Sequence, residues 1–121
     1  MTSFDTQAIT SAANSDGEFR LAARLWNADI RLEVGVDAYL LRMRKGLIDE
    51  FCKADASKWD VKISAPKSDW QELLKPIPKP FYQDLMAAMT RQDFKVEGDL
   101  LGFNPYYRAT CRLFELMRKA R

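Results

Sequence analysis

The chain has 121 residues, with 19 Lys+Arg against 17 Asp+Glu and a formal net charge of +2. This length fits one domain with one core, and the charge lacks the clustered basic character of proteins that bind nucleic acid. The chain has no apolar run of about 18 residues, and its N-terminus lacks the pattern of a signal peptide. Composition therefore predicts a cytoplasmic protein that neither binds nucleic acid nor inserts stably into membranes.

Metal and cofactor sites are not expected. The chain has no histidine, and its two cysteines, Cys52 and Cys111, lie far apart without a CxxC spacing. A zinc site needs a closer set of thiolate or imidazole ligands. Both cysteines are therefore expected to be reduced apolar residues.

Alternating apolar and polar residues predict four successive strands. The even positions from Trp26 to Val34 are apolar and the odd positions between them are polar, which is typical of a strand with one wet face. The same alternation follows at 39–43, before a Lys45-Gly46 hairpin corner, and again at 59–65. In residues 47–53 apolar and polar side chains alternate less regularly, and this segment is predicted to be a third strand. Short turns between strands with one polar face predict an antiparallel meander that is covered on one side.

Helices are expected after these strands. Ser68 and Gln71 have the spacing of a capping box, and the prolines of 76–80 make a stiff connector. From Phe81 the apolar residues recur with a helical period, and 94–98 alternate as a fifth strand. Residues 1–17 are expected to form a weak helix or an arm.

The last helix is predicted to start at Asn104 as N-cap, with Pro105 in the first helical position. Its apolar residues spread over more than half of the helix circumference. A helix on a sheet needs an apolar arc only a little over 100° wide. Neighbouring helices, a partner subunit and a ligand held between helix and sheet are three explanations for the remainder.

The order of elements resembles that of the sterol carrier protein 2 family. The residues that carry the likeness are Trp59-Asp60-Val61-Lys62-Ile63-Ser64-Ala65-Pro66, Asp69-Trp70-Gln71-Glu72-Leu73-Leu74 and Val96-Glu97-Gly98-Asp99. It extends over about 18–120. The chain departs from the family pattern in its dense prolines, in the bulky Tyr106-Tyr107 pair and in its end, Lys119-Ala120-Arg121, which is no Ser-Lys-Leu peroxisomal address.

The resemblance implies a single α+β domain over 1–121. It has a mainly antiparallel five-stranded sheet, helices over one face, and an apolar tunnel between sheet and helices. It also implies a protein without enzymatic activity that binds or transfers a sterol, fatty acid, fatty acyl-CoA or similar hydrophobic molecule. Aromatic, aliphatic and methionine side chains suit such a pocket. The expected lining residues are Trp26, Trp70, Phe81, Tyr82, Leu85, Met86, Met89, Leu101, Phe103, Tyr106, Tyr107 and Phe114.

Two other functions stay open at this stage. In the first, the wide face of the last helix docks on a second copy of the chain or on an enzyme that handles apolar substrates, as an accessory subunit. In the second, the chain is a small isomerase or cyclase that uses a lone Asp or Tyr in an apolar pocket. No catalytic residue is expected, because the sequence has no histidine base, no Ser-His or Cys-His pair and no phosphate loop.

Overall fold

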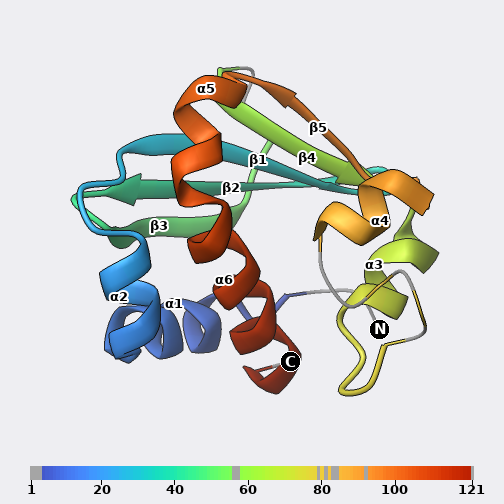
Figure 1. Ribbon diagram of the computed structural model, residues 1–121, viewed down its shortest axis with the longest axis horizontal. Helices are drawn as coiled ribbons and strands as arrows, with labels where there is room; N and C mark the ends of the chain where they lie inside the picture. Colours follow the sequence, from blue (N-terminus) through green and yellow to red (C-terminus); the bar gives the residue numbers. More distant parts are fainter. Residues whose placement is uncertain are drawn as a thin grey trace.

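A single five-stranded sheet organises the molecule (Figure 1). In this computed structural model, the described residues are 4–55, 58–78, 80, 82, 85–91 and 93–120. The strands are β1 (Ala28–Val34), β2 (Asp37–Arg44), β3 (Leu47–Lys53), β4 (Val61–Ala65) and β5 (Lys95–Gly98). Their order in the sheet is β3-β2-β1-β4-β5. The predicted five-stranded, mainly antiparallel sheet is confirmed.

The predicted meander is correct for three strands and wrong for the fourth. β4 does not pair with β3 but lies parallel to β1, with Leu32 opposite Ile63, while the other pairs are antiparallel. Alternation in a sequence specifies which face a side chain takes. It does not specify which strand becomes the neighbour, so sequential pairing was the wrong inference here.

The β2–β3 hairpin explains the poor alternation of the third strand. Lys45 and Gly46 have φ values of 53° and 78°, which is the pair of left-handed residues that a type I′ turn requires. Arg42 is then opposite Glu50, and Met43 is opposite Ile48, which leaves Asp49 without a partner strand residue. This bulge adds one residue and shifts the inward positions of β3 by one.

Charged side chains cover the outer face of the sheet. The Arg42 guanidinium lies 3.3 Å from Asp29 and 3.1 Å from Glu50, and Arg31 lies 2.7 Å from Glu33. The inward positions of the same strands carry buried apolar residues. The sheet is therefore packed on one side only, as the alternation predicts.

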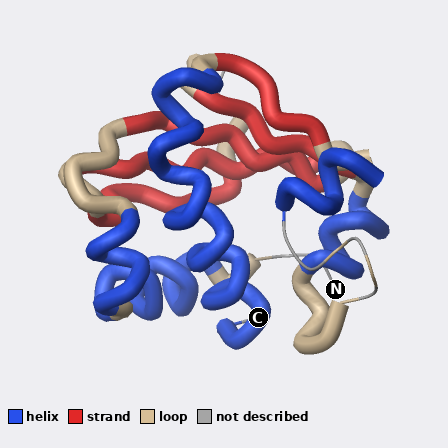
Figure 2. Tube along the Cα trace, viewed as in Figure 1, coloured by secondary structure: helices blue, strands red, loops and turns tan. Residues whose placement is uncertain are grey.

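The helices lie against the other face (Figure 2). They are α1 (Thr6–Ser15), α2 (Gly17–Ala22), α3 (Lys67–Leu73), α4 (Leu85–Arg91), α5 (Leu100–Phe103) and α6 (Tyr107–Ala120), with a 3₁₀ turn, η1 (Asn104–Tyr106), between α5 and α6. Asp5 and Asp16 cap α1 and α2, because their carboxylates accept the N–H groups of Ala8 and Phe19 at 3.1 and 2.8 Å. The N-terminal segment is thus a capped helix. None of the described helices is long and apolar enough to cross a bilayer.

The closing helix starts earlier than predicted. The Asp99 carboxylate accepts the N–H of Gly102 at 3.0 Å, so Asp99 is the N-cap. Asn104 already has helical dihedrals, φ −53° and ψ −40°. Pro105, which has no N–H to donate, falls in the 3₁₀ turn between the two α-helical segments. The segment 100–103, which the predicted start at Asn104 excludes, forms the first helical turn as α5.

Two other helix predictions need correction or lie beyond the description. Ser68 sits inside α3, whose N-cap is Pro66 and has no side-chain hydrogen bond. The helix expected from Phe81 is described as α4 from Leu85, and Phe81 lies outside the described residues.

Candidate functional site

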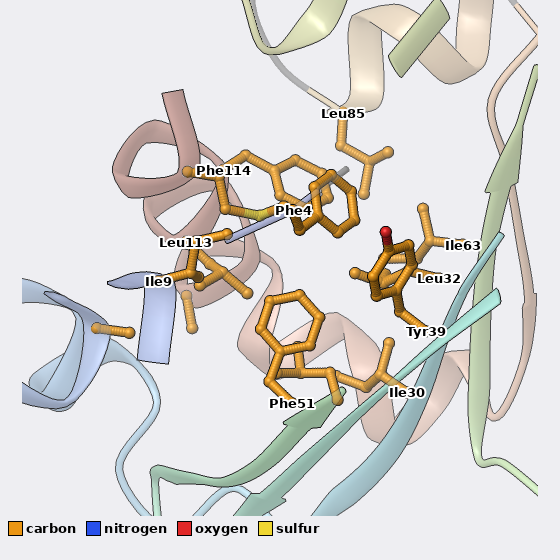
Figure 3. Packing of buried hydrophobic residues seen from close by; sticks show 14 of the residues in the cluster. Phe4, Ile9, Ile30, Leu32, Tyr39, Phe51, Ile63, Leu85, Leu113 and Phe114 are labelled. Carbon is orange, nitrogen blue, oxygen red and sulfur yellow. The ribbon is translucent and has the colours of Figure 1, made fainter. Parts of the chain in front are cut away.

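The candidate site is the interior between the sheet and the helices. Ile30, Leu32 and Ile63 from the strands belong to one buried cluster with Ile9 and Leu113 from α1 and α6, and aromatic rings lie between the two groups (Figure 3). Each of these five side chains is at most 2% exposed. Burial of this much aliphatic surface fixes the helices on the sheet.

The position of α6 in the fold explains the width of its apolar face. It contacts α1 and α2 as well as the core, and Ala109, Leu113 and Phe114 are buried. Neighbouring helices therefore account for much of the arc that exceeds the width needed for a sheet. The buried part of this face is not available for docking of a partner.

Trp70 is the centre of an aromatic cluster in this interior. Its ring lies 5.0 Å from Phe94, 5.7 Å from Phe114 and 5.8 Å from Phe4, all in edge-to-face arrangements. The indole N–H donates to the Glu33 carbonyl at 2.7 Å. The polar atom of this side chain is thus satisfied, and its apolar surface faces the core.

A second aromatic group lies where α5 and η1 meet the start of β1. Trp26 stacks on Tyr106 with ring centroids 5.0 Å apart, and Phe103 lies 6.4 Å from Trp26. Trp26 and Phe103 are 2% and 4% exposed. Residues from opposite ends of the sequence are therefore brought together here.

The predicted lining residues divide by burial. The buried ones are Trp26, Trp70, Leu85, Phe103 and Phe114. Tyr82, Tyr106 and Tyr107 are half-buried and pack against the core. Met86, Met89 and Leu101 are 60%, 41% and 87% exposed, so they lie at the surface rather than in the interior. Phe81 is outside the described residues.

Polar contacts attach α4 and the segment before it. The Tyr107 hydroxyl accepts the N–H of Met86 at 2.8 Å, and the Tyr82 hydroxyl donates to Asp69 at 2.8 Å. Arg118 donates to the Leu73 and Tyr82 carbonyls at 2.8 and 3.2 Å. Burial, together with the adjacent Asp69 carboxylate, raises the pKa of Tyr82 to about 12. Its hydroxyl is therefore a fixed donor at neutral pH.

Three pockets lined by described residues open at the surface. The largest of the three, about 350 Å³, is lined by residues that include Glu33, Ser64, Asp93 and Lys95. The smallest, about 140 Å³, borders Trp26 and Phe103 beside Asp60 and Asp99. None of these three is an enclosed apolar chamber. The tunnel that the resemblance implies stays a prediction.

Within the described part of the chain, no three potential metal ligands come together. Asp16 has its pKa lowered to about 2 because it accepts hydrogen bonds from Arg112 and from the Phe19 N–H. The ion pair between Asp16 and Arg112 joins the N-terminus of α2 to α6. The lowered pKa of Asp16 therefore follows from a contact that stabilises the fold.

One polar group in the interior escaped the sequence analysis. The alternation at 39–43 predicts that Tyr39 lies on the apolar face of a strand, and the structure confirms this position, with the residue 4% exposed. The available signal was a hydroxyl on an inward position among aliphatic ones. Strand alternation indicates the face of a side chain but not whether its hydroxyl has a partner, so the sequence does not single out Tyr39.

Comparison with solved structures decides the fold. A crystal structure of sterol carrier protein 2 superposes with a TM-score of 0.79 at 22% identity, over 100% of this chain and 99% of that one. The chain has the sterol carrier protein 2 fold.

Two further structures support the same assignment. A conserved hypothetical protein of Thermus thermophilus, described as possibly a sterol carrier protein, gives a TM-score of 0.72 at 23% identity, over 95% of this chain and 85% of that one. A UbiJ-SCP2 ubiquinone synthesis protein gives 0.62 at 18%, over 94% and 88%. No family model and no curated protein matches the sequence. The recognised likeness to sterol carrier protein 2 is thus confirmed at the level of the fold.

Proposed function

We propose that this protein binds a hydrophobic small molecule, such as a sterol, a fatty acid or another acyl chain, between its sheet and its helices, and carries it without chemical change. The full-length superposition on sterol carrier protein 2 is the observation that carries the proposal. Each buried CH₂ group of such a ligand contributes about 0.8 kcal/mol, so binding needs apolar lining and no catalytic group.

The described interior supports this proposal by its chemistry. It combines the aliphatic inner face of the sheet with the aromatic cluster around Trp70. Lipid pockets need such side chains together with few polar groups. In the described residues, the buried polar or charged side chains are Glu72 and Thr110. Met86 and Met89 lie on the outer side of α4, where flexible thioethers suit the mouth of a binding site.

Saturable uptake of diphenylhexatriene, a fluorescent hydrocarbon, tests the proposal. We expect one equivalent of probe per chain, with displacement by long-chain lipids. The variant Val36→Ser is a control, because Val36 is fully exposed and removal of its side chain only reduces surface adsorption. Uptake that does not saturate, or that falls in this variant as much as in an interior variant such as Leu113→Ser with retained fold, would contradict the proposal.

An accessory role beside an enzyme is the second candidate. The similar structure described as a ubiquinone synthesis protein favours it, as do the exposed methionines of α4. In this case Met86→Asp dissolves a complex with an enzyme or a second copy. Light scattering of the wild-type protein and the variant measures the assembly.

A further inference from the structure

Tyr39 brings a phenol into the otherwise apolar interior. It projects from β2 on the inner side of the sheet, and its ring centroid lies 4.7 Å from that of Phe4 and 6.1 Å from that of Phe51. Figure 3 shows its oxygen pointing away from β2 into the cluster, on the side of Phe4. The hydroxyl is therefore directed at the space between sheet and helices.

The Tyr39 hydroxyl differs from the other polar groups of this interior in its hydrogen bonding. The Trp70 N–H and the Tyr82 hydroxyl are bonded to Glu33 and Asp69. The Tyr39 hydroxyl forms no hydrogen bond with any described residue, although buried phenols usually do. It therefore has a donor and an acceptor that are free to meet a ligand.

The oxygen also borders open space. Among the described residues, no side-chain nitrogen or oxygen is both fully enclosed and without a hydrogen-bond partner. Because the Tyr39 oxygen has no partner, it is not fully enclosed, and a group the size of water reaches it.

The charged side chains near the interior indicate whether a charged or an uncharged ligand oxygen can bind there. Among the described residues, the buried charged side chain is Glu72, an anion 3.0 Å from Lys75. The cross-strand neighbour of Tyr39 is Lys53, whose side chain is 63% exposed and pairs with Asp37 at 3.3 Å. A carboxylate that leaves water for such a site lacks a positive partner, which is costly. An alcohol or a carbonyl oxygen needs one hydrogen bond only, and Tyr39 supplies it.

We propose that Tyr39 is the polar anchor of the bound molecule, and that this molecule is an uncharged lipid with a hydroxyl or carbonyl oxygen, such as a long-chain or sterol alcohol. The inference rests on the proposed function and specifies its ligand class. The ligand enters with its oxygen toward Tyr39 and its hydrocarbon along the aliphatic inner face of β1 and β4.

Displacement of diphenylhexatriene by hexadecanol, palmitate and hexadecane tests this proposal. We expect the wild-type protein to prefer hexadecanol to both others. Tyr39→Phe removes one oxygen and leaves the ring, so hexadecanol is expected to bind about fivefold more weakly, while hexadecane binds as before. The preference among the three ligands in the wild-type protein tests the proposal independently of how the variant folds.

Thr110→Val is the matched control. It also removes one buried hydroxyl, but that hydroxyl donates to the Tyr106 carbonyl at 3.1 Å, one turn earlier in the chain. We expect it to leave the ligand preference unchanged. Equal loss of hexadecanol and hexadecane in Tyr39→Phe, or palmitate bound best by the wild-type protein, overturns the role of Tyr39 while the proposed function stands. A wild-type protein that takes up neither probe nor lipid contradicts both.

Discussion

Trp70 shows at the residue scale how one side chain serves the fold. It is fully buried, touches aromatic rings from three other segments and hydrogen-bonds the backbone of β1. From the sequence, Trp70 is predicted to line a ligand site. In the structure it holds α3 on the sheet.

The substitution Trp70→Phe is expected to lower the free energy of unfolding by about 2 kcal/mol, because it removes one hydrogen bond and leaves a small cavity. Urea unfolding measures the loss. Trp59→Phe is the control, because Trp59 is half-buried and is expected to change stability by less than about 0.5 kcal/mol. Equal effects of both substitutions would show that the Trp70 contacts do not stabilise the fold.

The ion pair between Asp16 and Arg112 predicts an acid-sensitive stability. The carboxylate accepts two guanidinium hydrogen bonds at 2.8 and 3.0 Å and one from the Phe19 N–H, which lower the pKa of Asp16 from 3.8 to about 2. A group whose pKa is lower in the folded state stabilises the fold fully above the unfolded-state pKa, here about pH 4. That contribution is lost as pH falls toward 2.

We therefore expect Asp16→Asn, which keeps the cap, to unfold at lower urea concentration than wild type at pH 6, with a difference that shrinks between pH 4 and pH 2. Glu18→Gln is the control, because Glu18 lies 3.7 Å from Arg112 and is mostly exposed. A difference between Asp16→Asn and wild type that stays constant over this pH range would assign the effect to something other than the charge.

At the scale of elements, the corner between β5 and α5 decides where the closing helix starts. Gly98 has φ 109°, and a Cβ added there would clash with the Asp60 carbonyl oxygen. The following Asp99 is the cap, and its N–H donates to that same carbonyl at 2.8 Å. The corner ties the end of the sheet to the helix that covers it.

Gly98→Ala is expected to destabilise the protein by more than about 1 kcal/mol, because alanine disfavours this dihedral and its Cβ has no room. Gly17→Ala provides the matched control. Gly17 begins α2, and an added Cβ meets nothing within 4 Å, so stability is expected to stay or to rise by up to about 1 kcal/mol. Thermal unfolding of both variants separates the corner from a general effect of glycine replacement.

The positions of the strands and helices in the sequence could be predicted better than the way in which these elements pair. Alternation located the strands because each has one wet and one buried face, as β1 and β4 show. The parallel pairing of these two strands depends on contacts between distant residues, which the local pattern does not contain. The start of the closing helix was wrong for a related reason: Asp99 and Asn104 are both good caps, and only the position of the sheet selects Asp99.

The site was predicted in part. Helical spacing marked Leu85 and Phe114 as inward, and both are buried. The same spacing included Met86 and Met89, which the structure leaves exposed, because a short helix on one side of the core buries a narrower face than the sequence pattern covers. Tyr39 was missed because strand alternation predicts only which face a side chain takes. It gives no information on whether the hydroxyl has a hydrogen-bond partner.

At the scale of the whole molecule, one architecture serves both stability and binding. Ion pairs between charged side chains cover the outer face of the sheet. The helices pack on the other face through apolar side chains, and α6 adds a few hydrogen bonds. In the account proposed above, a hydrophobic ligand binds between these two layers. Its uptake competes only with contacts among the core side chains.

Native mass spectrometry of the freshly purified chain tests the proposed binding most directly. The account predicts a species heavier than the 14.0 kDa chain by the mass of one hydrophobic molecule, which denaturing solvent releases as an uncharged lipid with a hydroxyl or carbonyl oxygen. A bare chain that also takes up no added sterol, long-chain alcohol or fatty acid would contradict it.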